Sequence, residues 1–171
     1  DDEEYGAECH ALVETLGVRD LIFTGRVNVV EYMEKLDFTI LTSISEGQPL
    51  SVLESLAARR PCVTTEVGCC RELLEGAPGD DFGVAGFVTP PMYRKGLADA
   101  MERMCTSRAR RIDMGERGQR RVATYFLHEQ MLANYRALYD ETARAFDLPR
   151  EGEYHVYVGN TYFKGANGFK Y

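Results

Sequence analysis

The sequence predicts an α/β fold in which helices cover both faces of a parallel sheet. Helix-like and strand-like segments alternate along residues 5–104, the pattern of a parallel sheet covered by helices. The predicted strands are short, continuous apolar runs of the kind that is buried on both faces. A chain of 171 residues has room for one domain with a real core.

The amino-terminal part is predicted to hold two helices and two strands. Apolar residues within 5–16 share one helical face, and Gly17 follows at the position favoured for a left-handed cap. Residues 21–24 form a short apolar run that predicts a buried strand. A brief helix over 30–36 then leads to a second buried strand at 38–41.

Turn residues and apolar periodicity place the remaining elements of the sheet region. They are a polar loop at 42–48, a helix at 49–59, a strand at 61–64, a helix at 69–75, a strand at 85–88 and a helix around 97–104. Residues 108–148 are predicted to be helical with a break near Phe126, and 155–164 to form a hairpin with a two-residue turn. We therefore expect one domain over 1–148 and an aromatic-rich tail over 149–171.

Composition excludes several classes of protein. A formal charge of −7 and a pI of about 5.1 argue against nucleic acid as a partner, because polyanion binding needs a basic footprint. Five cysteines without a C-x-x-C pair favour buried thiols over disulfides or zinc. An acidic start and the lack of a long apolar run predict a soluble, cytoplasmic protein.

One basic segment stands out in this acidic chain. Residues 103–121 contain seven arginines against two acidic residues. A solvated helix face is the simpler interpretation. Contact with anionic lipid at the inner face of the membrane is the alternative.

The loop after the strand at 38–41 carries the features of an anion site. In a parallel sheet, ligands bind at the carboxyl ends of the strands, where this loop lies. Pro49 suits the first turn of the following helix, and Gly47 lets the backbone approach a ligand closely. The free amides of that first turn, with their partial positive charge, would bind a phosphate.

Two carboxylates flank this anion site. Glu46 lies in the loop, and Glu54 is the single charged residue between Gly47 and Ala58. Glu54 shares a helical face with leucines and alanines, so we expect it to need a partner, because burying an unpaired carboxylate is costly. Ligand hydroxyls would serve, and the alternatives are a position of Glu54 at the solvent-exposed edge of this face or a structural ion pair with an arginine such as Arg59 or Arg71.

The run S-I-S-E-G-Q-P-L-S-V-L-E-S-L-A-A-R-R-P-C-V-T-T-E-V-G, residues 43–68, resembles the E-x7-E signature of the family 4 retaining glycosyltransferases. These enzymes have the GT-B fold, and the resemblance is to its Rossmann-like carboxyl-terminal domain. Supporting matches are F-T-G-R-V, L-D-F-T-I-L-T-S, V-G-C-C-R-E-L-L-E-G and A-N-Y-R-A-L-Y. Within the family, the chain looks most similar to the Pel exopolysaccharide glycosyltransferase group.

The resemblance implies a role for each matching residue. Glu46, as the catalytic residue, would contact hydroxyls of the donor hexose, and Glu54 would bind the ribose. Arg26 and Val27 would border the base. The remaining donor-binding residues lie around the phosphate, where backbone amides would hold it: Gly47, Gln48, Pro49, Leu50 and Ser51. No metal or other cofactor is implied, and the expected donor is UDP-glucose or a similar UDP-hexose.

The chain departs from the family in its extent. The amino-terminal domain with the acceptor site has no counterpart in this sequence, and neither has the first strand of the carboxyl-terminal domain. We therefore expect a hexosyltransferase domain that binds the donor and is inactive alone, with a missing acceptor domain or partner subunit. The alternatives are a noncatalytic nucleotide-sugar-binding or interaction module and a GT-B-type UDP-sugar epimerase.

Overall fold

The computed structural model describes residues 3–146, 153–158 and 161–166. The chain divides into two compact units, Asp1–Leu36 and Asp37–Tyr171. The larger unit contains every strand of the described part of the chain.

The smaller unit consists of two helices and the coil between them. Helix α1 spans Glu3–Thr15, and the φ of 62° at Gly17, two residues after its end, confirms the predicted left-handed cap. Helix α2, Val29–Met33, is shorter than predicted, and the Asn28 side chain accepts a hydrogen bond from the Val30 amide at its start.

The strand predicted at residues 21–24 is wrong, because these residues are coil. Their apolar side chains are exposed, with Ile22 at 80%. The described residues of this unit include no strand that could pair with them. Since a strand needs a hydrogen-bonded neighbour, an apolar run alone does not produce one.

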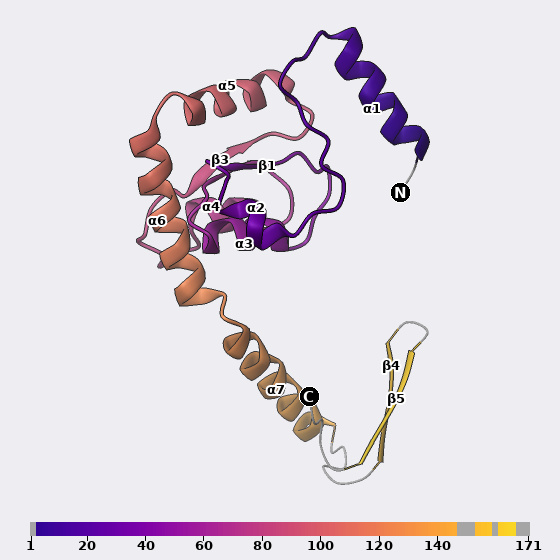
Figure 1. Cartoon of the computed structure of the whole chain (residues 1–171). Helices are drawn as coiled ribbons and strands as arrows, with labels where there is room; N and C mark the ends of the chain where they lie inside the picture. Colours follow the sequence, from indigo (N-terminus) through magenta and orange to yellow (C-terminus); the bar gives the residue numbers. More distant parts are fainter. Residues whose placement is uncertain (1–2, 147–152, 159–160, 167–171) are drawn as a thin grey trace. The chain divides into compact units, whose positions relative to one another are not determined.

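The larger unit is built on a three-stranded parallel sheet (Figure 1). Its strands β1 (Thr39–Leu41), β2 (Cys62–Thr65) and β3 (Gly86–Thr89) lie in that order. The predicted strand β2 is fully buried, but β1 is only half-buried and Ile40 is 42% exposed. The expectation that β1 is buried on both faces is therefore wrong, because β1 is an edge strand of this sheet.

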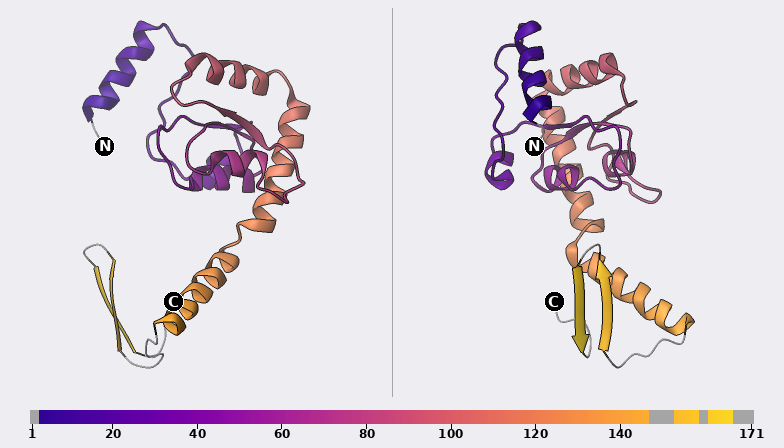
Figure 2. Two further views of the ribbon diagram at one scale, coloured as in Figure 1. Left: turned by 180° about the vertical axis from the view of Figure 1, so that it is seen from behind. Right: turned by 90° about the vertical axis from the view of Figure 1, so that its right-hand side faces the viewer.

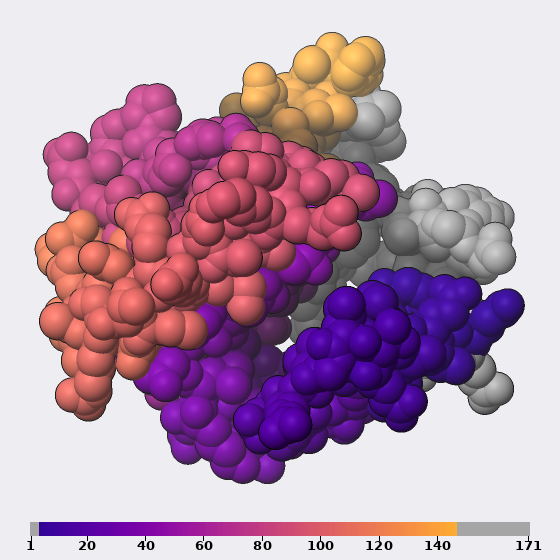
Figure 3. All heavy atoms as spheres, turned by 90° about the horizontal axis from the view of Figure 1, so that it is seen from above, coloured from indigo at the N-terminus to yellow at the C-terminus, as the bar shows by residue number. Residues whose placement is uncertain are grey.

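Helices cover both faces of the sheet. They are α3 (Leu50–Ala57), α4 (Cys70–Glu75), α5 (Arg94–Cys105) and α6 (Arg108–Tyr125). Successive residues of β2 point to opposite faces: Cys62 packs with α3 and α4 around Leu56, and Val63 packs with α5 around Met104. Figure 1 shows α5 on one side of the sheet and α3 and α4 on the other. The side of α5 that faces away from the sheet forms part of the surface of the larger unit, as Figure 3 shows.

Most of the arginine-rich segment is engaged inside this unit. Six of its seven arginines make hydrogen bonds, ion pairs or ring contacts within the larger unit, two of them to residues of the same segment: Arg103, Arg110, Arg111, Arg117, Arg120 and Arg121. Arg111, for example, donates to the last carbonyls of α5 and pairs with Asp37. The local charge is therefore largely structural, and contact with a membrane stays a prediction.

The carboxyl-terminal elements match the predicted order. Helix α6 ends at Tyr125, and α7 (His128–Ala145) follows, so the break predicted near Phe126 is confirmed. Strands β4 (Glu153–Val158) and β5 (Thr161–Ala166) pair in antiparallel fashion, as Figure 2 shows. The predicted turn residues 159–160 lie outside the described residues. Within the described ranges, no helix is long and apolar enough to cross a membrane.

Candidate functional site

Two loops meet at the carboxyl edge of the parallel sheet. The β1–α3 loop (residues 42–49) follows Leu41, and the β2–α4 loop (residues 66–69) follows Thr65. The Cys69 amide donates a hydrogen bond of 3.0 Å to the Gly47 carbonyl. Since parallel strands end at the same edge, the predicted anion loop lies where a ligand would bind an α/β sheet.

The first turn of α3 presents unused amides at this edge. The Pro49 carbonyl accepts from the amides of Val52 and Leu53, and Pro49 provides no side-chain cap. Four amides donate to no atom in the described part of the chain: those of Gly47, Gln48, Leu50 and Ser51. Free donors at the positive end of a helix dipole suit a phosphate.

Glu46 is held beside these amides. Its side chain is half-buried and accepts a hydrogen bond of 2.7 Å from the Ser43 hydroxyl. Ser43 is itself fixed, because its carbonyl accepts a hydrogen bond from the buried Thr65 hydroxyl. The carboxylate therefore has a defined position at the rim of the site.

Glu54 lies on the open side of α3 instead of in a buried stripe. The buried residues of the helix are Val52, Ser55 and Leu56, whereas Glu54 is exposed and its neighbour Leu50 is 68% exposed. The expectation of a carboxylate on a buried apolar face is therefore wrong, and the alternative of a glutamate at the exposed edge of that face is confirmed, because Leu53 packs half-buried against the core while Glu54 lies in solvent.

The structural ion pair considered for Glu54 is also absent from the described residues. Arg59 donates to Gln119, and Arg71 forms ion pairs with Glu66 and Glu75. Glu54 is thus a solvent-facing carboxylate one helical turn after Leu50, available to a ligand that lies over this face.

Arg26 and Val27 belong to the smaller unit. They lie in the coil that precedes α2, directly after Gly25, which has a φ of 61°. Arg26 is exposed and Val27 is half-buried. Their predicted contact with the base stays a prediction.

Gly68 is a site residue that sequence reasoning missed. Its φ is +51°, and a Cβ at this position would lie 2.1 Å from the Gly47 carbonyl oxygen and 2.5 Å from that of Glu46. Only glycine lets the two loops approach so closely. The signal was present, because Gly68 directly follows the strand and turn T-T-E-V in the quoted motif.

The cysteines of β2 and of the β2–α4 region are protonated thiols. Burial raises the pKa of Cys62, Cys69 and Cys70 above the usual range, which disfavours the thiolate needed for nucleophilic attack or metal binding. Among the residues that the structure describes, no group of three or more histidines, cysteines or carboxylates is placed to hold a metal ion.

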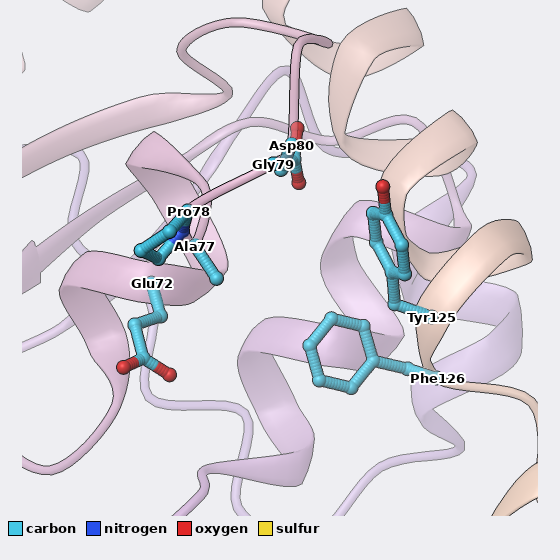
Figure 4. Close-up of a pocket in the computed structure, with 7 residues that line it drawn as sticks. All are labelled: Glu72, Ala77, Pro78, Gly79, Asp80, Tyr125 and Phe126. Carbon is cyan, nitrogen blue, oxygen red and sulfur yellow. The ribbon is translucent and has the colours of Figure 1, made fainter.

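Two hollows lie on the larger unit. One, of about 430 Å³, is lined by Gln48 of the β1–α3 loop and by four residues of α7: Met131, Asn134, Tyr135 and Leu138. The other, of about 280 Å³, lies between the loop after α4 and the end of α6 (Figure 4). Tyr125 and Phe126 form one wall of the second hollow, and Glu72 and Asp80 lie across from them. Only the first hollow includes a predicted site residue.

Comparison with known sequences identifies related proteins. The sequence family described as "Glycosyl transferases group 1" matches residues 1–107. The chain is 28% identical over 135 residues to N-acetyl-alpha-D-glucosaminyl L-malate synthase of Bacillus anthracis, covering 78% of this chain and 34% of that protein. It is 26% identical over 142 residues to the lipopolysaccharide core biosynthesis mannosyltransferase LpsB of Rhizobium meliloti, covering 82% and 39%. The chain thus spans well under half the length of these relatives.

Solved structures share the fold. The sucrose-phosphate synthase of Thermosynechococcus elongatus superposes with a TM-score of 0.71 at 22% identity, over 81% of this chain and 34% of that chain. The carboxyl-terminal domain of the group 1 family protein LpcC from Francisella tularensis gives a TM-score of 0.60 at 19% identity, over 74% and 65%. The predicted α/β fold of a GT-B carboxyl-terminal domain is therefore confirmed.

Proposed function

Because the chain belongs to the group 1 glycosyl transferases, we propose that it is the donor-binding domain of a hexosyltransferase. The transferase moves a hexose from a nucleotide sugar to a growing polysaccharide or glycoconjugate. The observation that carries this proposal is the row of free amides at the start of α3, beside Glu46 at the carboxyl edge of the sheet. The acceptor site lies on a further domain or a partner subunit, and this chain alone does not transfer the hexose.

Each part of the site has one task in this proposal. The amides of Gly47, Gln48, Leu50 and Ser51 hold the distal phosphate, and Pro49 fixes the turn that exposes them. Glu46 binds hydroxyls of the hexose, and Glu54 binds the ribose from the open face of α3. Arg26 and Val27 border the base. The reaction needs no metal, because amides already stabilise the charge that develops on the departing diphosphate.

The finer identity of the substrates is part of the same proposal. We propose UDP-glucose or a similar UDP-hexose as the donor. The runs L-T-S-I-S-E-G-Q-P-L and V-G-C-C-R-E-L favour the Pel exopolysaccharide group, which makes a polysaccharide the acceptor. A cytoplasmic location follows from these substrates as a prediction.

Replacing Glu54 by alanine is expected to weaken UDP binding about tenfold. This loss corresponds to one hydrogen-bonded ribose contact, worth about 1.4 kcal/mol. Isothermal titration calorimetry of the 171-residue chain with UDP measures it. Glu116→Ala is the matched control, since Glu116 is also an exposed helical glutamate and lies on α6. Equal UDP affinities for Glu54→Ala and the wild type would contradict the assignment of Glu54 to the ribose.

Replacing Glu46 by alanine is expected to affect the sugar and spare the nucleotide. UDP-glucose binding should weaken about tenfold while UDP binding stays unchanged, because Glu46 contacts hexose hydroxyls alone. Titration with both ligands, and with UDP-N-acetylglucosamine and GDP-mannose as competing donors, measures the difference. An equal loss for UDP and UDP-glucose would overturn the assignment of Glu46 to the sugar.

The same titrations, followed by product analysis, separate an interaction module and an epimerase from the proposed function. A noncatalytic interaction module that lacks a donor site would bind none of the nucleotides. An epimerase would convert bound UDP-N-acetylglucosamine or UDP-glucose without an acceptor, which product chromatography detects. A donor-binding domain binds the nucleotide sugar and leaves it intact.

A further inference from the structure

Glu46 is tied to the sheet through Ser43, and the proposed function makes no use of this contact. The Ser43 hydroxyl donates to Glu46 Oε1 at 2.7 Å, and both side chains are half-buried. We propose that Ser43 is a positioning residue that sets the orientation of the Glu46 carboxylate toward the donor hexose. This inference rests on the proposed function, because it assigns Glu46 to the sugar.

The contact is anchored in the core of the domain. The Thr65 hydroxyl donates a hydrogen bond to the Ser43 carbonyl, and Thr65 is 5% exposed at the end of β2. Thr65 lies in register with Thr89 of β3 in the ladder of the sheet. Movement of the Ser43 backbone would therefore break a part-buried hydrogen bond, which keeps the Ser43 hydroxyl within reach of Glu46.

The chemistry of the pair leaves the carboxylate free for a ligand. A carboxylate has about four acceptor positions on two oxygens. The single Ser43 hydroxyl proton occupies one of them, on Oε1. The second oxygen is available to accept hydrogen bonds from two neighbouring hydroxyls of a sugar. A glutamate without the Ser43 hydrogen bond would first have to give up side-chain rotamer freedom to bind these hydroxyls. That loss corresponds to about a tenfold lower binding constant.

The role of Ser43 can be separated from simple loop stability. Ser43→Ala removes the hydroxyl but keeps the backbone carbonyl that accepts from Thr65. The amides that bind phosphate follow Glu46 in the chain. Those of Gly47 and Gln48 lie in the loop, and those of Leu50 and Ser51 lie in the first turn of α3. Loss of the hydroxyl should therefore change the affinity for the hexose and leave the affinity for the nucleotide as it was.

The test is calorimetric titration of the full chain with UDP and with UDP-glucose. The quantity of interest is the ratio of the two dissociation constants, which reports what the hexose adds to binding. Ser43→Ala is expected to weaken UDP-glucose binding about five- to tenfold and UDP binding not at all. Ser43→Thr keeps a hydroxyl and should retain most of the wild-type ratio. Ser45→Ala is the control, because Ser45 is an exposed serine of the same loop without a hydrogen bond to the described residues.

A double-mutant cycle shows whether Ser43 acts through Glu46. In the Glu46→Ala background, Ser43→Ala should have no further effect on the ratio, because the acceptor of the hydroxyl is gone. A further loss of similar size in that background would overturn the positioning role and assign Ser43 a direct contact or a structural role.

The outcomes distinguish this inference from the proposed function. If the wild type binds UDP-glucose more tightly than UDP and Ser43→Ala preserves that ratio, the inference is wrong and the proposed function stands. If Ser43→Ala weakens UDP and UDP-glucose equally, Ser43 stabilises the loop and does not position Glu46. If the wild-type chain gains nothing from the hexose, the assignment of Glu46 to the sugar fails, and the inference fails with it.

Discussion

Replacing Arg121 by methionine is expected to lower the free energy of unfolding by about 3–5 kcal/mol. The Arg121 side chain is 1% exposed and forms a two-point ion pair with Asp80, whose side chain is 4% exposed. It also donates to three backbone carbonyls, those of Leu73, Leu74 and Gly83. Methionine fills a similar volume but leaves the Asp80 carboxylate with only the Phe82 amide as a donor among the described residues and takes a donor from three carbonyls, of which that of Leu74 keeps its bond from the Ala85 amide. Urea denaturation at neutral pH measures the loss.

Arg117→Met is the matched control for this variant. Arg117 lies on the same helix and pairs with Asp113, but the two side chains are 38% and 56% exposed. An exposed pair of this kind contributes about 0.2–1 kcal/mol, so the control should be close to the wild type. Equal losses in the two variants would show that the Arg121 contacts do not hold the loop after α4 to α6.

The ion pair also predicts how stability depends on pH. The hydrogen bond from Arg121 lowers the pKa of Asp80 below its usual value, with burial acting in the opposite direction. The folded state therefore binds fewer protons than the unfolded state just below pH 4. This contribution is complete above about pH 4 and is lost as the pH falls through the folded pKa of Asp80. Arg121→Met should lack this acid-sensitive component.

The local sequence pattern predicts where the helices and strands of the larger unit lie. It does not predict which side of each element is buried. The apolar residues of α3 lie on two sides: Val52 and Leu56 are buried in the core with the half-buried Leu53 packed against them, whereas Leu50 is exposed on the side of Glu54. Periodicity cannot choose between these sides, because the choice depends on where the sheet lies. The same limit explains residues 21–24, whose apolar run predicts a strand although the described residues offer them no neighbouring strand.

The site shows the same division between local and long-range information. The free amides at the start of α3 follow from Gly47 and Pro49, which act within a few residues of each other. Ser43, Thr65 and Gly68 matter because two loops separated by a helix and a strand come into contact. A single sequence carries no direct signal for such contacts. In the sequence, Arg121 likewise does not differ from the other six arginines of its segment, because its carbonyl partners lie in distant parts of the chain.

Replacing Gly68 by alanine is expected to disrupt the β1–α3 loop and to weaken UDP binding by roughly a hundredfold or more. The added Cβ would lie 2.1 Å from the Gly47 carbonyl oxygen and 2.5 Å from that of Glu46. These atoms must separate by roughly 1 Å or more to reach an ordinary contact, and neither is the tip of a flexible side chain. The shift breaks the hydrogen bond from the Cys69 amide to Gly47 and misaligns several phosphate-binding amides. Losing more than one charge-assisted hydrogen bond gives an effect of this size.

Stability should fall in the same variant, and the cause can be isolated. The φ of +51° at Gly68 and the collision together are expected to cost about 2–4 kcal/mol of unfolding free energy. Gly79→Ala is the matched control, because Gly79 also has a positive φ, of +91°, but a Cβ there would meet nothing within 4 Å. The control should lose about 1 kcal/mol from backbone strain alone and bind UDP like the wild type. Wild-type UDP affinity in Gly68→Ala would show that the approach of the two loops does not shape the anion site.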